Sequence, residues 1–396
     1  MNKFYFKFSF FKSYLRSIRD YFFLKEKILQ SFSLEYSSIK SKNLPSIRVT
    51  ESKNQIAFSN YFVKRMRSFL KESYGAPSSH WKNIYKLLNL TGATKDLMDM
   101  DDVSFFNFFA NPHTNNLHYG FGDISKEIIE NYRVWDFYIS KNIYDTIFRI
   151  CSSLGIRNYP ETYHTHKFNH ESPDFMLEDI FKFLGKKSYF PNIFIGEFGI
   201  KTKFGIVSRS AIQQMYHAIR LAQLLNDLKI KEPKVLEIGA GLGMSAYHSK
   251  NFGIENYFIL DLPLGCISQS FFLASTIGQE NIIIGDEILK INHSEEKFKK
   301  SIKLISSTDT DLVPENIDVI LNCDSLTEMS KDQAIAYAKM AEKKSKYFLS
   351  FNHEGNEFTI YDIFKSTSFK RVYRAQAWYR AGFVEELYVN TSLVKN

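Results

Sequence analysis

The sequence of 396 residues is poor in cysteine and has no long hydrophobic run. Its three cysteines, Cys151, Cys266 and Cys323, lie far apart and form no C-x-x-C pair, which excludes a disulfide framework and a zinc site built on such pairs. This usage is typical of a reducing cytoplasm. Because no stretch reaches the roughly 18 apolar residues that a membrane-spanning helix needs, we expect no transmembrane segment.

Outside the first 50 residues the net charge is close to zero. Residues 1–50 hold ten Lys and Arg against three Asp and Glu, which is +7 of the net +8 of the whole chain. The nearly neutral remainder argues against a nucleic-acid-binding surface. The basic, Phe- and Tyr-rich segment either lies on an anionic membrane surface or is an extended arm packed on the body of the protein, and we favour the second.

The length predicts more than one domain. Residues 51–200 have mostly helical patterns; the longest, from Asp123 to Ser153, carries five isoleucines and Trp135 at spacings of four or seven. Beyond residue 200, short apolar runs alternate with helical patterns and end in two β-rich runs. We therefore expect a basic aromatic arm (1–50), a mainly helical substrate-side domain (51–200) and an α/β domain (201–396) with an open, Rossmann-like sheet.

Residues 233–263 have the layout of a nucleotide-binding βαβ unit. A short apolar run, Val235 to Ile238, leads into a glycine turn, and a second apolar run ends in Asp261. Glycines without a Cβ let the backbone approach a ligand closely, and the helix that begins near Met244 points free N–H groups at that ligand. Asp261 lies 22 residues after Gly239, a spacing at which its carboxylate can accept both hydroxyls of a ribose.

The glycine spacing separates two classes of ligand. The dinucleotide fingerprint G-x-G-x-x-G fails at its last position, Met244. Here the glycines alternate, and an acid stands two residues before the first, a pattern that resembles motif I of the S-adenosylmethionine (SAM)-dependent methyltransferases. The resemblance implies SAM as cofactor; NAD and a purely structural glycine turn are the alternatives. The cofactor residues expected from this unit are Glu237, Gly239, Gly241, Gly243, Asp261 and Leu262.

Polar residues also follow the later apolar runs, and in open α/β sheets ligands bind at the carboxyl ends of strands. Asp286 follows the run 281–285, and Asn322 follows the run 317–321, so we expect both at the cofactor site. The run 302–305 competes with 281–285 for the place of the third strand; the spacing favours 281–285 without deciding the question.

Three later segments resemble one family. Tyr257 to Ser275 resembles the Y-x-I-I-D-L-P…Q-x-Y-F-L segment of the sugar O-methyltransferases of bacterial surface-glycan gene clusters, with Gln269 at the glutamine position. Leu321 to Ser330 resembles that family's N-x-x-S-x-x-E-M segment, and Ser350 to Glu354 resembles S-x-N-x-E. The resemblance covers roughly residues 190–390 and implies a class I SAM-dependent fold acting on a sugar hydroxyl. Because the D/N-P-P-Y/F motif of enzymes that methylate DNA base amines is absent after Asn322, a base amine is disfavoured as substrate.

A hydroxyl is a weak nucleophile at neutral pH, so a base or a metal should assist the reaction. His353 is the first candidate base, because an unperturbed histidine titrates near ~6.5, and Asp324 and Glu328 come next. Asp324 and Glu328 could also hold a divalent metal, but two carboxylates alone do not indicate one. His164 and His166 have a spacing similar to the metal site of cupins without its flanking glycines, so we predict no metal there.

We therefore expect a cytoplasmic bacterial methyltransferase whose partner is a sugar or sugar-nucleotide acceptor, with the inner face of the membrane as the alternative location. One rival is a methyltransferase of a lipid-linked or small-molecule acceptor, docked on the membrane by residues 1–50. A second rival is a methyltransferase-like module that binds without turnover.

Overall fold

The computed structural model describes residues 46–48, 59–72, 93–110, 133–157, 171–194 and 196–394. The arm expected at residues 1–50 lies outside this description, apart from the short strand β1 (Ser46–Arg48). Residues 123–132 of the expected long helix also lie outside it; the rest forms α7 (Arg133–Ser153). None of the helices in the described ranges combines the length and hydropathy that a membrane span requires.

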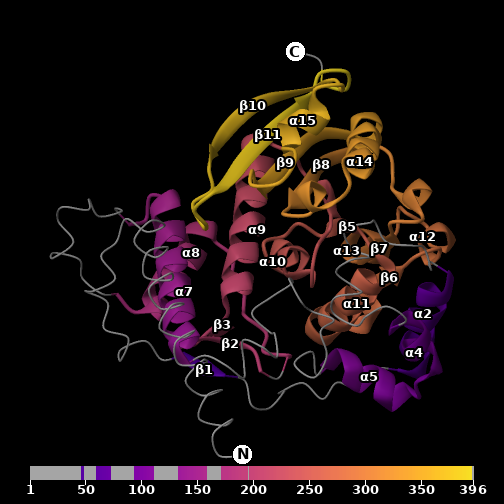
Figure 1. The fold of residues 1–396 in the computed structure, drawn as a ribbon, viewed down its shortest axis with the longest axis horizontal. Helices are drawn as coiled ribbons and strands as arrows, with labels where there is room; N and C mark the ends of the chain where they lie inside the picture. Colours follow the sequence, from indigo (N-terminus) through magenta and orange to yellow (C-terminus); the bar gives the residue numbers. More distant parts are fainter. Residues whose placement is uncertain are drawn as a thin grey trace, which may run out of the picture.

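An eight-stranded sheet forms the centre of the fold, in the order β10-β11-β9-β8-β4-β5-β7-β6 (Figure 1). Six neighbouring strands, β9, β8, β4, β5, β7 and β6, are parallel to one another. The hairpin of β10 and β11 lies at one edge, and β11 pairs antiparallel with β9. The expected open, Rossmann-like α/β sheet is confirmed, and the described elements that precede it in the chain are mainly helices. The strands are β4 (Lys234–Ile238), β5 (Asn256–Asp261), β6 (Ile282–Ile284), β7 (Ile302–Ser306), β8 (Ile317–Cys323), β9 (Ser345–His353), β10 (Phe369–Gln376) and β11 (Phe383–Asn390).

Both runs that competed for the third strand are strands, and their order in the sheet resolves the question. β7 pairs with β5 in the register Asp261↔Ser306, whereas β6 pairs only with β7 and lies at the edge. The neighbour of β5 is therefore the run 302–306, not the run 281–285. β4 lies between β5 and β8, so the order in which successive strands are added to the sheet reverses at β4. Open α/β sheets bind their ligands at such a reversal point.

Helices cover both faces of the sheet because its central strands alternate between two hydrophobic cores. Val235 and Ile259 face one core, while Leu236 and Phe258 face the other. The first face is covered by α9 (Arg209–Asp227), α10 (Met244–Asn251) and α11 (Pro263–Ile277). The second is covered by α12 (Glu287–Lys290), α13 (Glu296–Lys300), α14 (Lys331–Lys344) and α15 (Ile360–Phe364).

The described N-terminal helices form two groups on either side of α9 to α11 (Figure 1). α2 (Asn60–Glu72), α4 (Ala93–Asp99) and α5 (Asp102–Ala110) lie beside α11, where the rings of Phe106 and Phe271 meet edge to face with centroids 5.2 Å apart. α7 and α8 (Pro173–Leu184) pack on the other side, with α7 against α9. The helical region and the sheet thus share one hydrophobic core.

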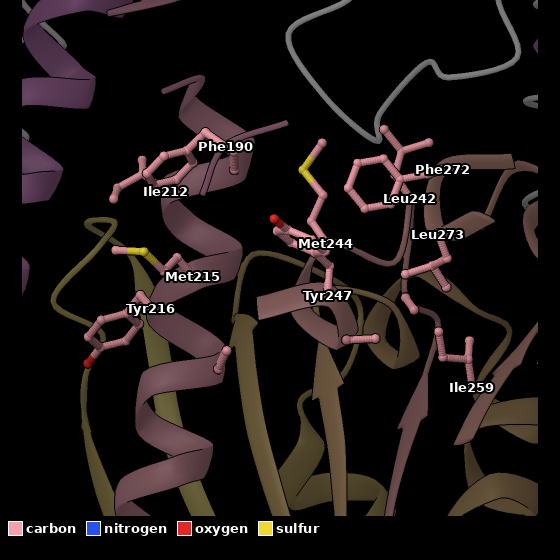
Figure 2. Close-up of a cluster of buried hydrophobic side chains, with 14 of the residues drawn as sticks. Phe190, Ile212, Met215, Tyr216, Leu242, Met244, Tyr247, Ile259, Phe272 and Leu273 are labelled. Carbon is pink, nitrogen blue, oxygen red and sulfur yellow. The ribbon is translucent and has the colours of Figure 1, made fainter. Parts of the chain in front are cut away.

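A small sheet, β1-β2-β3, lies at the junction of the two expected domains. β2 (Phe198–Thr202) runs across the boundary expected at residue 200 and pairs with β1 and β3 (Gly205–Val207). Next to it, the shared core gathers side chains from α9, α10 and α11, and Figure 2 shows this cluster. Its members include Ile212, Met215, Met244, Tyr247, Phe272 and Leu273.

Candidate active site

The glycine turn leaves bare backbone between β4 and α10. Gly239, Gly241 and Gly243 have φ angles of +71°, +56° and +81°, a region that residues with a Cβ rarely adopt. A Cβ on Gly239 would lie 2.3 Å from Oγ of Ser325. The first glycine is therefore required by packing as well as by backbone conformation, and the turn presents backbone rather than side chains at the start of α10.

Asp261, at the end of β5, ties the glycine turn to the neighbouring helix. Its Oδ2 accepts hydrogen bonds from the Ala240 N–H at 2.9 Å and from Nε2 of Gln269 at 2.6 Å, and its Oδ1 accepts one from the Leu262 N–H at 2.7 Å. Burial raises the pKa of Asp261 to about 6, although all three hydrogen bonds act to lower it. Near neutral pH the carboxylate is ionised, and Oδ1 keeps room for a further donor.

Gln269 of α11 lies at the candidate site, although it is not among the expected cofactor residues. Besides its bond to Asp261, Nε2 donates to the carbonyl oxygen of Gly241 at 3.0 Å. Its Oε1 is buried and has no hydrogen-bond partner among the described residues. The only sequence signal for Gln269 is its place in the family resemblance. Its side chain joins the glycine turn to the acid, and that relation needs the tertiary structure.

Glu237 lies in β4, on the face of the sheet covered by α9 and α10. The side chain is 1% exposed, and its carboxyl accepts a hydrogen bond from the Tyr257 hydroxyl at 2.9 Å. Burial raises its pKa to about 8, with a further contribution from the charge of Asp261. Glu237 is thus a protonated, buried group below the turn at neutral pH.

Asn322, at the end of β8, fastens three strand ends together. Its Nδ2 donates to the carbonyl oxygen of Ile238 at 2.9 Å and to Oγ of Ser325 at 2.5 Å, while its Oδ1 accepts from Nδ2 of Asn352 at 2.9 Å. The side chain is fully buried. Because its polar atoms are engaged with β4, β9 and the loop after β8, Asn322 holds the edge of the sheet in shape.

The three expected catalytic residues lie together beyond this network. Asp324 follows β8, Glu328 ends the short helix η7 (Leu326–Glu328), and His353 ends β9. One donor atom from each can be chosen so that all three lie within 4.8 Å of one another, and Nε2 of His353 is 3.5 Å from Oδ1 of Asp324. Three segments distant in the sequence thus converge on one spot.

Burial governs the charges of the two carboxyls. It raises the pKa of Glu328 to about 7; the neighbouring charge of Asp324 adds to this and Arg380 opposes it. Burial also raises the pKa of Asp324, against His353 and Arg380, which favour the ionised form. The backbone of Asp324 is left-handed, with φ +53°, a conformation that residues other than glycine adopt infrequently and often at functional sites.

Arg380 and Phe383, which the sequence analysis did not single out, lie beside this cluster. The guanidinium of Arg380 lies 4.3 Å from the ring centre of Phe383, and the ring of His353 is 5.5 Å from the same ring. A second histidine, His217, is buried, and its ring stacks on that of Phe351 with the ring centroids 4.7 Å apart. Burial lowers the pKa of His217 to about 3, and neither of its ring nitrogens has a hydrogen-bond partner among the described residues, so it is neutral.

Two of the predicted sites require separate comment. Asp286 follows the edge strand β6, is more than half exposed and pairs with Nζ of Lys290 at 2.6 Å, so the structure does not bring it to the other residues. The loop that borders Asp261 is instead the one after β7, because the Ser307 N–H donates to the carbonyl oxygen of Asp261 at 2.7 Å. His164 and His166 lie outside the described residues.

The sequence matches no protein-family model and no curated protein. Among solved structures it is similar to magnesium protoporphyrin IX methyltransferase from Synechocystis PCC 6803 with bound SAM, with 12% identity, a TM-score of 0.31 and coverage of 46% of this chain and 83% of that one. It is also similar to the CcbJ methyltransferase from Streptomyces caelestis, with 11% identity, a TM-score of 0.31 and coverage of 45% of this chain and 89% of that one. A third similar structure is the methyltransferase domain of a bacterial Hen1, with 14% identity, a TM-score of 0.29 and coverage of 45% of this chain and 99% of that one. At this level of similarity the neighbours carry no information about the substrate of this chain.

Proposed function

We propose that this protein is a SAM-dependent O-methyltransferase that transfers a methyl group to a hydroxyl of a sugar, a sugar nucleotide or a surface glycan. One observation carries the proposal. The glycine turn, Asp261 and the cluster of Asp324, Glu328 and His353 all lie at the carboxyl ends of neighbouring strands, β5, β4, β8 and β9. A cofactor site and a proton-accepting site therefore share one edge of one sheet, where open α/β sheets bind ligands.

The cofactor half of the site offers groups that suit SAM. Asp261 offers an ionised carboxylate for the ribose hydroxyls, and the bare turn from Gly239 to Gly243 allows close approach of the cofactor to the start of α10. The unpartnered Oε1 of Gln269 adds a buried acceptor beside the same turn. Bound SAM supplies an electrophilic methyl group on a sulfonium centre.

The acceptor half supplies groups for a hydroxyl. As the acceptor oxygen forms its bond to the methyl carbon, the carbon–sulfur bond breaks and the hydroxyl proton must go to a base. His353, Asp324 and Glu328 are the three groups in reach of one another that can take it, and the raised pKa of Glu328, about 7, suits such a role. We therefore place the acceptor hydroxyl against this cluster.

The sugar assignment is supported by where the family-like segments lie. Tyr257 to Ser275 forms β5 and α11, Leu321 to Ser330 contains the end of β8 and η7, and Ser350 to Glu354 contains the end of β9. The three segments meet at the proposed site, as expected if their likeness reflects shared chemistry. The free cysteines support a reaction in a reducing cytoplasm.

The first test is calorimetric titration of the full-length protein with SAM and with S-adenosylhomocysteine. We expect saturable binding of both ligands and a loss of at least tenfold in affinity for Asp261→Ala. Asp286→Asn is the matched control, because Asp286 is a carboxylate outside the site, and it should keep wild-type affinity. Absence of binding in protein shown to be folded would refute the proposal. With binding established, incubation with sugar nucleotides and SAM should give a product heavier by one methylene unit in mass spectra.

A further inference from the structure

Asp324, Glu328 and His353 make an uncommon arrangement, with two carboxyls and an imidazole close together and Arg380 as the neighbouring positive charge. Two carboxylates and an imidazole converge within 4.8 Å, yet no hydrogen bond joins any two of them, and the one close approach is the 3.5 Å contact of His353 with Asp324. Oδ1 of Asp324 is buried without a hydrogen-bond partner among the described residues. Two half-buried carboxylates repel each other unless a positive charge or a shared proton lies between them.

The spacing of the donor atoms suits a metal ion. An ion with ligands at about 2.1 Å holds adjacent donors about 3.0 Å apart and opposite donors about 4.2 Å apart. Donors that lie within 4.8 Å of one another need only small side-chain rotations to reach these distances. The ligands would come from three rigid places, namely the end of β8, the end of η7 and the end of β9.

Neighbouring contacts hold two of the three ligands in place. The Asp324 N–H donates to the carbonyl oxygen of Phe351 in β9 at 2.9 Å, which fixes its left-handed backbone. The Glu328 N–H donates to the carbonyl oxygen of Ser325 at 3.1 Å. Asn322 and Ser325 in turn join this loop to β4. The carboxylates are therefore presented from a braced backbone, the property that a preformed cation site requires.

Coordination through Nε2 of His353 has two local consequences: it displaces the 3.5 Å contact of Nε2 with Nδ2 of Asn356, and it fixes the ring proton on the other nitrogen. Nδ1 of His353 now accepts from the Gly355 N–H at 3.2 Å, and a metal on Nε2 puts the ring proton on Nδ1. The Gly355 N–H must then turn to water, which costs little because this hydrogen bond lies at the surface. The side chains of Asp324 and His353 are about one third exposed, at 32% and 31%, so the site also has room for ligands from outside the protein.

We propose that Asp324, Glu328 and His353 bind one divalent cation of the Mg²⁺ or Mn²⁺ type. Two of the three donors are carboxylates, which suit these ions, and the single imidazole favours Mn²⁺ of the two. The exposed positions of the ion are where the acceptor hydroxyl would bind, so the inference deepens the proposed function and rests on it. In this arrangement His353 is a ligand and not the base. The ion would orient the acceptor oxygen and lower the pKa of its hydroxyl, and the carboxylate oxygen of Asp324 or Glu328 that is not bound to the ion would accept the proton.

The test uses Mn²⁺ alone with the metal-stripped full-length protein, followed by electron paramagnetic resonance of free Mn²⁺ and by calorimetry. We expect one saturable site, competition by Mg²⁺, and a loss of at least tenfold in affinity for Asp324→Asn and for Glu328→Gln. Asp286→Asn is again the matched control and should bind as the wild type does. Circular dichroism must show that each variant is folded.

Two outcomes would overturn the proposal. One is the absence of saturable binding at millimolar Mn²⁺. The other is binding that Asp324→Asn and Glu328→Gln leave unchanged, which would place the ion elsewhere. A SAM titration of the same samples separates this proposal from the proposed function: SAM binding without Mn²⁺ binding refutes the cation site alone, while Mn²⁺ binding without SAM binding refutes the methyltransferase.

Discussion

Gln269 donates a hydrogen bond of 2.6 Å to the carboxylate of Asp261 and, from the same nitrogen, one of 3.0 Å to the carbonyl oxygen of Gly241. One side chain thus fixes the distance between the acid that would bind the ribose and the turn that would lie along the rest of the cofactor. Both partners belong to segments before α11, so the helix sets the shape of the site without contributing a charge to it.

Replacing Gln269 should weaken SAM binding through this positioning role. Gln269→Ala removes both hydrogen bonds and leaves the Ala240 and Leu262 N–H groups to hold Asp261. The loss of a hydrogen bond to a charged group predicts a fall in SAM affinity of about tenfold. Thr276→Ala, on the same helix away from the site, is the control. Calorimetric titration with SAM measures the effect, and equal affinities for the two variants would show that Gln269 has no such role.

SAM affinity should fall in acid because Asp261 must be ionised to accept hydroxyl donors. The pKa of this carboxyl is about 6, so it is ionised above pH 6, and the ionised fraction falls about tenfold for each pH unit well below it. Between pH 7.5 and pH 5 we expect the affinity to fall by about tenfold. Asp261→Asn should bind weakly with no such decline. A decline of the same size in Asp261→Asn would assign the titration to another group.

The sequence predicted those parts of the site that depend on local patterns. The glycine turn, Asp261 and the residues after β8 and β9 each follow a recognisable apolar run, and the rule that ligands bind at the carboxyl ends of strands was enough to place them together. Asp324, Glu328 and His353 were expected together in this way, although Asp324 and His353 are 29 positions apart in the sequence.

Strand pairing and side-chain partners were not predictable in the same way. The runs 282–284 and 302–306 are both short and apolar, and only the pairing of β7 with β5 shows which one borders Asp261. The expectation for Asp286 depended on that choice. Likewise, amphipathic patterns revealed which side of a helix is apolar but not its partner, so the division of the N-terminal helices into two groups was not foreseen.

Gly239 should tolerate a side chain less well than a glycine with the same backbone conformation elsewhere. Gly239 and Gly155 both have φ +71°, but a Cβ on Gly239 meets Ser325, whereas a Cβ on Gly155 has nothing within 4 Å. Gly155→Ala should therefore cost about 1 kcal/mol of unfolding free energy through backbone strain alone. Gly239→Ala should cost about 2 to 4 kcal/mol because overpacking is added.

Denaturant unfolding of both variants measures this difference, and a third variant tests its cause. Ser325→Gly removes the Oγ and Cβ atoms that the new methyl group would meet, so the double variant Gly239→Ala/Ser325→Gly should lose less stability than the two single variants predict together. Strict additivity would mean that the contact with Ser325 does not explain the requirement for glycine.

Glu237 should make the protein less stable as the pH rises. In the unfolded chain this carboxyl loses its proton near its ordinary pKa of 4.5, whereas in the folded protein burial keeps the proton until about pH 8. Between these values the folded state binds the extra proton, so the free energy of unfolding falls by up to about 1.4 kcal/mol per pH unit. Glu237→Gln has no proton to lose and can still accept the hydrogen bond from Tyr257.

The measurement is urea unfolding of the wild type and of Glu237→Gln at pH 5.5 and 7.5. The buried histidines His217 and His248, whose pKa values are lowered to about 3, contribute a dependence of opposite sign, but they are present in both proteins and cancel in the comparison. Relative to the wild type, Glu237→Gln should gain about 2 to 3 kcal/mol of stability between the two pH values. Glu280→Gln, at an exposed position, should follow the wild type. Parallel pH profiles for the wild type and Glu237→Gln would mean that Glu237 is already ionised in the folded protein.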